Sequence, residues 1–365
     1  MKKTIAGICR TLLGVVFIFS GVVKAIDPLG TVYKIEDYLK AFGGFFTDLL
    51  PLAEVAAWGL IMLELLLGVC MLLNVRTQWT SWISLLFYSV MMPLTLYIAL
   101  TNPVSDCGCF GDAIVLTNWQ TFWKNVVLII LAIILIALRK SVRELWQTWM
   151  EGVIAAVTII LVVAFMLWTK NHLPVKDFRP YKIGNHIPTL MEYPEDAEPD
   201  QYEITLVYEQ NGVEQAFTIE NYPKGDSTWT YVRTDSKLIK KGYEPPIHDL
   251  EIINAEGEDL TWDILESEES VTLVVMYDLE KANRKQINKV EALYETCLNN
   301  WQQCYILTGS GTDEIISFSL EFPSLSECIC TCDPVTLKTI VRANPGVIVV
   351  QNGVVIDKYN LRNRN

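Results

Sequence analysis

Long apolar runs fill the first half of the chain, whereas apolar and polar residues alternate over short distances in the second half. A helix needs ~20 mostly apolar residues to cross a bilayer. Segments of about this length lie at 4–26, 52–74, 78–100, 121–138 and 151–169. The pattern therefore predicts five membrane-spanning helices, followed by a water-exposed α/β part that begins near residue 171.

The first of these segments has a second interpretation. Lys2 and Lys3, the apolar run and a candidate cleavage site at Val23-Lys24-Ala25 are also typical of a secretory signal peptide. Arg10 interrupts the run, which argues against a signal peptide. Small residues recur every seven positions, at Gly7, Gly14 and Gly21. This spacing favours a spanning helix, because it places small residues on one face for close packing in lipid.

Charge is divided unevenly along the chain. The net charge of −13 consists of +2 over residues 1–170 and −15 over residues 171–365, so we expect no nucleic-acid partner. Basic residues gather at one set of span ends, namely Lys2, Lys3, Arg10, Arg76, Arg139, Lys140 and Arg143. By the positive-inside rule these ends are cytoplasmic, and loops 27–51 and 101–120 and the C-terminal half face outside.

One motif stands out in the second of these loops: Cys107-Gly108-Cys109-Phe110-Gly111-Asp112. Gly108 gives the backbone the freedom that a tight Cys-x-Cys disulfide needs, and the strain of such a ring makes it a better oxidant. Three interpretations stay open: a redox-active dithiol, a structural bridge and, on spacing alone, a metal site. In the redox interpretation Asp112 accepts a proton and a quinone in the outer leaflet is the candidate electron acceptor.

Charged residues inside spans are candidates for function or for helix packing. Glu64 lies in the middle of the second span, and Arg10 lies at a similar depth in the first span, so we expect them to pair. Lys24 and Glu54 form a second expected pair near the outer face. Both pairs either lock the helices together or support a buried proton or quinone site.

The membrane half resembles a known family. The stretch Phe19–Pro28 resembles the first-helix exit of DoxX-like membrane proteins, and Leu63–Gly68 resembles their second helix. The Cys-Gly-Cys-Phe-Gly loop is similar to that of the MauE branch, which is associated with disulfide formation and electron transfer. The resemblance covers about residues 4–140. It implies a four-helix bundle over 1–140, with a fifth helix over 141–170.

The water-exposed half begins with a segment rich in Pro and acidic residues, 171–200, which we expect to be a linker. A β-rich segment over 201–245 follows. Its strands Glu203–Tyr208 and Val213–Ile219 are joined at Asn211-Gly212, a hairpin signal, and Thr228–Arg233 is a third short strand.

Residues 246–365 show an alternation of strands and helices. Strands are expected at Asp249–Asn254, Val271–Tyr277, Cys304–Thr308, Gly346–Gln351 and Val354–Tyr359. Helices are expected at 281–299, Asp313–Leu320 and 334–343, the last with Asp333 as its N-cap and Pro334 at its first position.

This order is similar to that of thioredoxin-like domains of the TlpA or peroxiredoxin type. Residues 245–250 resemble their entry strand, and Asn344-Pro345-Gly346 resembles their cis-proline loop, so we predict a cis Asn344–Pro345 bond. Where the family has Cys-x-x-Cys, this chain has Glu280-Lys281-Ala282-Asn283, and the usual last helix is missing. The resemblance therefore implies a degenerate thioredoxin-like domain without its own dithiol chemistry.

The other cysteines leave several pairings open. Cys297 ends an expected helix and Cys304 begins the next strand, so a local disulfide between them is a reasonable expectation. Cys328, Cys330 and Cys332 alternate along one expected strand, which would place all three on the same face. They are either small strand residues, with one pair bridged, or a metal or redox cluster. No nearby His supports a zinc site.

Two functions are consistent with the sequence. The first is a membrane thiol–disulfide or electron-transfer protein with Cys107 and Cys109 as its redox pair and Glu64, Arg10 and Asp112 in support. The second is a non-enzymatic envelope scaffold whose exported domain binds a protein partner. Similar fusions are found as uncharacterised proteins of Bacteroidetes-type bacteria, which implies the bacterial inner membrane with a periplasmic C-terminal domain. Oligomeric state and substrate do not follow from the sequence.

Overall fold

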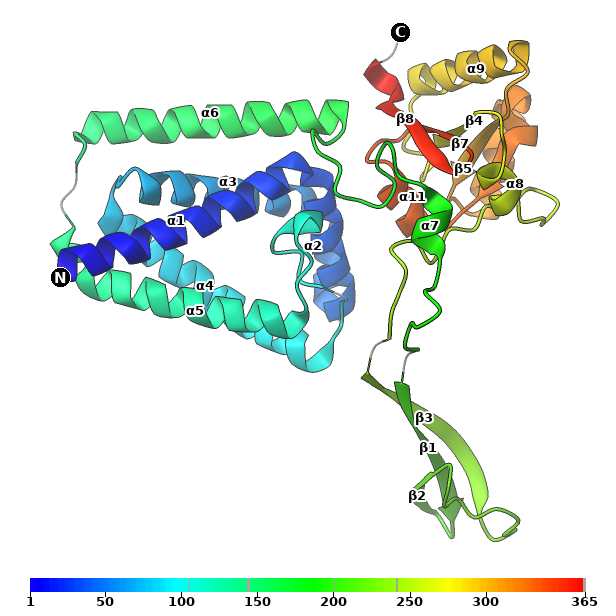
Figure 1. Cartoon of the computed structure of the whole chain (residues 1–365), viewed down its shortest axis with the longest axis horizontal. Coiled ribbons are helices and arrows are strands. Elements are labelled where there is room, and N and C mark those ends of the chain that lie inside the picture. Colours follow the sequence, from blue (N-terminus) through cyan, green and yellow to red (C-terminus); the bar gives the residue numbers. More distant parts are fainter. Residues whose placement is uncertain (105, 143–144, 200, 241, 364–365) are drawn as a thin grey trace.

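The computed structural model describes residues 1–104, 106–142, 145–199, 201–240 and 242–363. It consists of a helical bundle, a lobe built on a five-stranded sheet, and a small three-stranded sheet that projects away from both (Figure 1). Five helices of the described residues are long and apolar enough to span a membrane, at Lys2–Ile26, Gly44–Leu72, Thr77–Thr101, Asn118–Ser141 and Thr148–His172. The five expected spans are therefore confirmed as helices of spanning length.

The bundle contains helices α1 (Lys2–Ile26), α3 (Ala53–Leu72), α4 (Thr77–Thr101), α5 (Asn118–Leu138) and α6 (Thr148–His172). Small residues bring α1 and α3 into close contact. A Cβ on Gly21 would lie 2.6 Å from Leu65 Cγ, and a Cβ on Gly14 would lie 2.9 Å from Leu72 Cδ2. The packing face expected from the glycine spacing is thus present at these two positions, whereas no atom lies within 4 Å of a Cβ on Gly7.

The segment between the first two spans is helical, although the sequence was expected to form a loop there. Helix α2 covers Pro28–Phe42, and a 3₁₀ helix, η1, covers Gly44–Leu52. Asp27 is the N-cap of α2 and accepts a hydrogen bond from the Gly30 amide, while Pro28 occupies the first turn. This arrangement matches the usual chemistry of a helix start. It places α2 across the end of the bundle where α1 ends.

The small sheet has the strand order β2-β1-β3, with all neighbours antiparallel, from β1 (Gln201–Gln210), β2 (Val213–Thr218) and β3 (Thr230–Lys240). The expected hairpin is confirmed, because Asn211 and Gly212 connect β1 and β2 with φ values of +53° and +83°. Such positive φ angles suit Asn and Gly. The sheet projects away from the lobe and does not reach the bundle (Figure 1).

The lobe contains a sheet with the order β6-β5-β4-β7-β8. Its strands are β4 (Val271–Val275), β5 (Cys304–Thr308), β6 (Ile329–Thr331), β7 (Gly346–Gln351) and β8 (Val354–Asn360). The first three run parallel, while β7 is antiparallel to β4 and β8 is antiparallel to β7. Apolar side chains are buried on both faces of the sheet, since neighbouring residues of β4, Leu273 and Val274, belong to two different cores.

Short and medium helices flank this sheet, namely α7 (Ile187–Met191), α8 (Thr261–Leu265), α9 (Arg284–Asn299), α10 (Thr312–Glu321) and α11 (Pro334–Ile340). The expected cap of the last helix is confirmed, because Asp333 accepts hydrogen bonds from the amides of Val335 and Thr336. The Asn344–Pro345 peptide bond is cis, as predicted.

Three expectations for this half differ from the structure. Part of the expected linker belongs to the lobe, because Tyr181 and Ile187 are buried in its core. Residues 249–254 form isolated bridges from Ile253 to Asp259 and Thr331 rather than a strand. A strand needs consecutive ladder pairs, and a turn at 255–258 ends the pairing after one residue.

The shared face expected for three cysteines is also wrong. Cys328 ends a 3₁₀ helix, η4 (Pro323–Cys328), and packs into one core, whereas Cys330 and Cys332 pack into the other. Alternation of faces holds only within a strand, and β6 is three residues long.

Candidate functional site

The cysteine loop lies across the end of the bundle between α4 and α5. Cys107 is buried and Cys109 is partly buried, and their Sγ atoms are 2.8 Å apart. The sulfur atoms of a disulfide are about 2.05 Å apart. The two thiols are therefore free in this structure, and their sulfur atoms face one another directly.

A cluster of buried polar and charged groups contacts the loop from the bundle side. The Lys24 ammonium donates to both carboxylate oxygens of Glu64 at 2.9 Å, to Ser20 Oγ at 2.6 Å and to the carbonyl oxygen of Cys109 at 2.7 Å. Ser20 Oγ also donates to that carbonyl at 2.8 Å. The side chains of Lys24 and Glu64 are each 5% exposed. Two spanning helices thus hold the backbone of one cysteine through a single ammonium group.

The expected pair between Arg10 and Glu64 is therefore wrong. Arg10 instead donates to the main-chain oxygens of Met71 and Leu72 at the end of α3. The expectation assumed that the cytoplasmic ends of the two helices lie level. The glycine contacts shift α1 along α3, so that Glu64 faces Lys24 and Arg10 reaches only the last carbonyls of α3.

The other expected pair, between Lys24 and Glu54, is wrong for a related reason. Glu54 lies in the first turn of α3 and pairs with Lys170 near the end of α6. The ammonium group of Lys170 also lies 5.7 Å from the ring centroid of Trp58. Both groups are partly exposed, so this pair belongs to the rim of the bundle.

Helix α2 covers the loop from the opposite side. Tyr38 donates its hydroxyl hydrogen to the carbonyl oxygen of Cys107 at 2.7 Å, and Lys34 pairs with Asp106 at 3.0 Å. Gly108 has a φ of +63°, and a Cβ there would lie 2.7 Å from Lys34 Cγ. A residue with a side chain would be strained at this position and would also collide with α2.

A cavity of about 190 Å³ opens beside the two thiols. Its apolar wall comes from the bundle and includes Val16, Phe17, Leu60, Phe87, Met91, Leu94 and Leu128. Polar groups of the bundle also line it, among them Lys24, Glu64, Tyr88, Lys124 and Asn125. The dithiol therefore borders a mostly apolar space that holds a few hydrogen-bonding groups.

The two thiols have different acidities. The hydrogen bond between the two sulfur atoms raises the pKa of Cys107, and burial raises it further. The same hydrogen bond lowers the pKa of Cys109; burial opposes this effect, and the charges of Lys124 and Lys24 add to it. Cys109 is therefore the more acidic of the two thiols.

Asp112, the last residue of the motif, contacts the C-terminal lobe. Arg342 donates to Asp27 Oδ2 at 2.8 Å and to Asp112 Oδ2 at 3.4 Å, and its guanidinium lies 5.2 Å from the ring centroid of Tyr33. Burial raises the pKa of Asp112, although Arg342 opposes the shift. Asp112 thus binds the lobe rather than the thiols.

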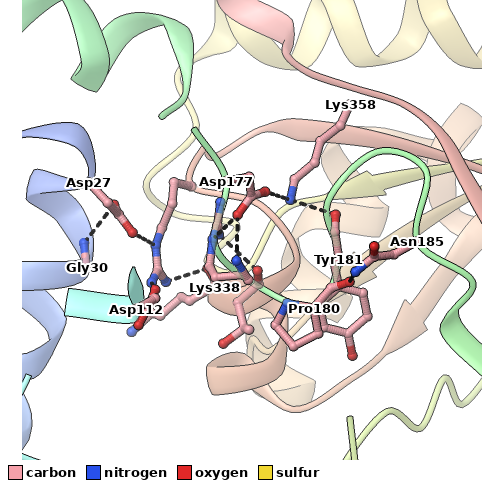
Figure 2. A network of polar contacts seen from close by, with 12 residues as sticks. Asp27, Gly30, Asp112, Asp177, Pro180, Tyr181, Asn185, Lys338 and Lys358 are labelled. Carbon is pink, nitrogen blue, oxygen red and sulfur yellow. Dashed lines mark hydrogen bonds and ion pairs between the residues drawn. The ribbon is translucent and has the colours of Figure 1, made fainter. Parts of the chain in front are cut away.

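A second set of ion pairs continues this contact into the lobe. Asp177 accepts hydrogen bonds from Arg179 at 2.8 Å and from Lys358 at 2.6 Å, and Lys358 also donates to the Tyr181 carbonyl at 3.0 Å. Arg179 Nη1 reaches the Thr339 carbonyl at 2.9 Å. Figure 2 shows the chain of contacts from Asp27 on the bundle to Lys358 on the lobe. The lobe is therefore held against the bundle end that carries the dithiol.

Sequence reasoning had not singled out several residues of this site: Ser20, Lys34, Tyr38, Lys124 and Arg342. One available signal was the presence of Lys124 near the start of an apolar span, where a charge is costly without a role. The others lie in helices or in the distant lobe, and their approach to the loop depends on how the elements pack.

Two parts of the chain match known families. Residues 2–138 match the family described as Methylamine utilisation protein MauE, and residues 202–241 match a domain of unknown function, DUF8463. No curated protein and no solved structure match the chain. The first match includes α1 to α5 and the cysteine loop, and the second corresponds to the small three-stranded sheet. The chain is thus a membrane protein whose bundle is similar to MauE.

Proposed function

We propose that this protein is a membrane-bound thiol–disulfide redox protein of the cell envelope, with Cys107 and Cys109 as its redox pair. The observation that carries the proposal is the 2.8 Å approach of the two sulfur atoms above the buried Lys24–Glu64 pair. A dithiol held face to face and beside a cavity suits reversible oxidation. The similarity of the bundle to a protein of methylamine utilisation supports a role linked to electron transfer.

Oxidation of the pair joins the two Sγ atoms and releases two protons and two electrons. Either a disulfide of a client protein or a lipid-soluble quinone accepts both electrons and both protons, the latter becoming a quinol. The cavity fits a quinone ring, because its bundle wall is apolar and Tyr88 and Lys124 supply hydrogen-bond donors. Client disulfides would reach the loop from the water-exposed side.

We further propose the bacterial inner membrane as the location, with the N-terminus cytoplasmic and the lobe periplasmic. The distribution of basic residues supports this orientation. Lys2, Arg76 and Arg139 stand at the ends of α1, α3 and α5 away from the cysteine loop, and Arg143 lies outside the described residues. On that orientation the dithiol lies in a compartment where disulfides persist.

The lobe is proposed to be a degenerate thioredoxin-like domain over 246–365. The strand order β5-β4-β7-β8, with β4 and β5 parallel and β7 and β8 antiparallel, supports the resemblance. Asn283, in the segment where the family has its dithiol, caps α9 by accepting a hydrogen bond from the Gln286 amide.

This cap favours a second candidate function, a non-enzymatic scaffold in which the lobe binds a partner protein of the envelope. Cys328, Cys330 and Cys332 of the lobe are buried, and burial raises the pKa of all three, that of Cys330 to about 11. Such thiols are poor nucleophiles at neutral pH. If the lobe performs no thiol chemistry, redox function depends entirely on the loop of the bundle.

Thiol trapping in intact membranes separates the two functions. Membranes are treated with a reductant, an oxidant or neither, the free thiols are alkylated, and the loop peptide is analysed by mass spectrometry. A redox protein shows Cys107 and Cys109 as thiols after reduction and as one internal disulfide after oxidation, without denaturation. A scaffold shows one state under all three conditions.

A further inference from the structure

Lys124 lines the cavity that the dithiol borders. It belongs to the second turn of α5. Its ammonium group lies 4.3 Å from the ring centroid of Phe110, the residue that follows Cys109. That ring packs edge-on against Phe19 of α1, with centroids 5.2 Å apart. The aromatic ring thus holds the lysine against the loop.

The other lysines around the loop are neutralised by carboxylates. Lys24 pairs with Glu64 at 2.9 Å, and Lys34 pairs with Asp106 at 3.0 Å. Within the part of the chain that the structure describes, no carboxylate lies within ion-pair distance of Lys124. Its positive charge is therefore uncompensated and faces a mostly apolar cavity, where charge interactions are weakly screened.

We propose that Lys124 is a positioning residue that stabilises the thiolate of Cys109 and so makes Cys109, rather than Cys107, the attacking sulfur. The inference rests on the proposed thiol–disulfide function. It adds to that function a direction of reaction and a residue outside the cysteine motif.

The reaction that follows is balanced. The Cys109 thiolate attacks one sulfur of a client disulfide, and the other client sulfur leaves as a thiolate. Cys107 transfers its proton to that leaving thiolate and attacks Cys109 Sγ. The client departs as a dithiol after a second proton is taken from water, and the protein keeps a Cys107–Cys109 disulfide. The client disulfide accepts two electrons from the dithiol of the protein, so no further oxidant is needed.

Cys109 is the more exposed of the two thiols, since Cys107 is buried and Cys109 only partly buried. Lys124 lowers the pKa of both thiols, and for Cys109 it is the charged group with the largest lowering effect. The ionisable groups that face the loop come from every neighbouring element. They are Lys24 of α1, Asp27 at the end of α1, Lys34 and Tyr38 of α2, Glu64 of α3, Tyr88 of α4, Lys124 of α5, Asp106 and Asp112 of the loop itself, Lys176, Asp177 and Arg179 after α6, and Arg342 of the lobe. Among these, Glu64 opposes the ionisation of Cys109.

The test measures the pH dependence of alkylation by iodoacetamide in the full-length, reduced protein. The loop peptide is analysed by mass spectrometry, so that Cys107 and Cys109 are followed separately. The variants are Lys124→Met, Lys124→Gln and Lys124→Arg. The control is Lys182→Met, because Lys182 is exposed and does not line the cavity.

We expect Cys109 to react before Cys107. In Lys124→Met and Lys124→Gln the midpoint for Cys109 should move upward by about one pH unit, which lowers its rate about tenfold below the midpoint. Lys124→Arg and Lys182→Met should keep the wild-type midpoint. Two neutral variants are used so that a folding defect in one does not decide the result.

Two outcomes overturn the inference: an unchanged midpoint in a folded neutral variant, or faster alkylation of Cys107. The measurement uses reduced protein and needs no redox turnover. If this measurement contradicts the role of Lys124, the proposed function is not thereby contradicted, because thiol trapping tests that function separately.

Discussion

Lys24 and Glu64 form a buried ion pair at 2.9 Å, and the same ammonium group holds the main-chain oxygen of Cys109 at 2.7 Å. The charges come from two different spanning helices, α1 and α3. The same ion pair therefore holds α1 against α3 and fixes the position of the dithiol loop. Removing one partner of a buried ion pair destabilises the fold, because the remaining charge stays buried without compensation.

We therefore expect Glu64→Leu to destabilise the bundle by about 3–5 kcal/mol, as measured by unfolding in mixed micelles with increasing dodecyl sulfate. The double variant Lys24→Met, Glu64→Leu should recover much of the loss, because it leaves no unpaired charge. Equal stability of the single variant and the wild type would contradict the role of the pair.

Gly108 should be intolerant of a side chain. Its φ is +63°, and a Cβ would lie 2.7 Å from Lys34 Cγ. The left-handed conformation costs about 1–2 kcal/mol for a residue with a Cβ, and the contact adds to this. Gly108→Ala should therefore slow formation of the Cys107–Cys109 disulfide by about 5–30-fold, as measured by quenching an oxidation reaction at set times.

Gly257→Ala is a suitable control for that variant, because Gly257 has a φ of +86° but no atom within 4 Å of a Cβ. It should leave disulfide formation unchanged. If both variants slow the reaction equally, the effect comes from the fold in general and not from the loop.

Arg342 should keep the lobe in place over the bundle. It pairs with Asp27 and Asp112 and stacks on Tyr33, all on the bundle side. Hydrogen bonds to charged groups contribute about 1.5–3 kcal/mol each. Arg342→Met should therefore speed limited proteolysis between residues 173 and 186 about tenfold or more.

The control for this change is Arg233→Met on the small sheet. Arg233 pairs with Glu214 at 2.8 Å, but both side chains are about half exposed, and such pairs contribute little. Cleavage between 173 and 186 should stay at the wild-type rate. An unchanged rate in Arg342→Met would show that other contacts fix the lobe.

The contact should also depend on pH through Asp27. Burial alone would raise the pKa of Asp27, but the charges of Arg342 and Arg179 and its hydrogen bonds lower it below the ordinary value. A carboxyl with a lowered pKa contributes stability above its unfolded pKa of about 3.9 and loses that contribution as the pH falls through the lowered value. Limited proteolysis should therefore stay slow at pH 5 and accelerate only below about pH 4.

Asp27→Asn is the variant that checks this assignment. It removes the titrating group, so the rate of cleavage should be higher at neutral pH and should lose much of its acid dependence. A variant that keeps the wild-type acid dependence would assign the effect to another carboxyl, such as Asp112.

The sequence was sufficient for the parts of the fold that depend on local patterns. Apolar runs identified the spans, Asn211-Gly212 identified a hairpin, and Asp333 with Pro334 identified a helix start. The cysteine loop was found from residue types alone. Each of these signals lies within a few neighbouring residues.

The sequence was insufficient where the outcome depends on the register of packed helices. The depth of Glu64 was estimated from the ends of its span, but Gly21 against Leu65 sets the offset between α1 and α3. Glu64 consequently pairs with Lys24 instead of Arg10. Arg342 was not foreseeable either, since more than 200 residues separate it from Asp112.

The central claim is that Cys107 and Cys109 interconvert between dithiol and disulfide in the folded protein. A redox titration of the full-length protein in defined thiol–disulfide buffers, read by mass spectrometry of the loop peptide, tests it most directly. The account predicts one reversible two-electron transition within the range of exchange proteins, about −120 to −270 mV, that is lost in Cys107→Ser and in Cys109→Ser. A pair that stays in one state across this range, until the protein is denatured, would contradict the claim.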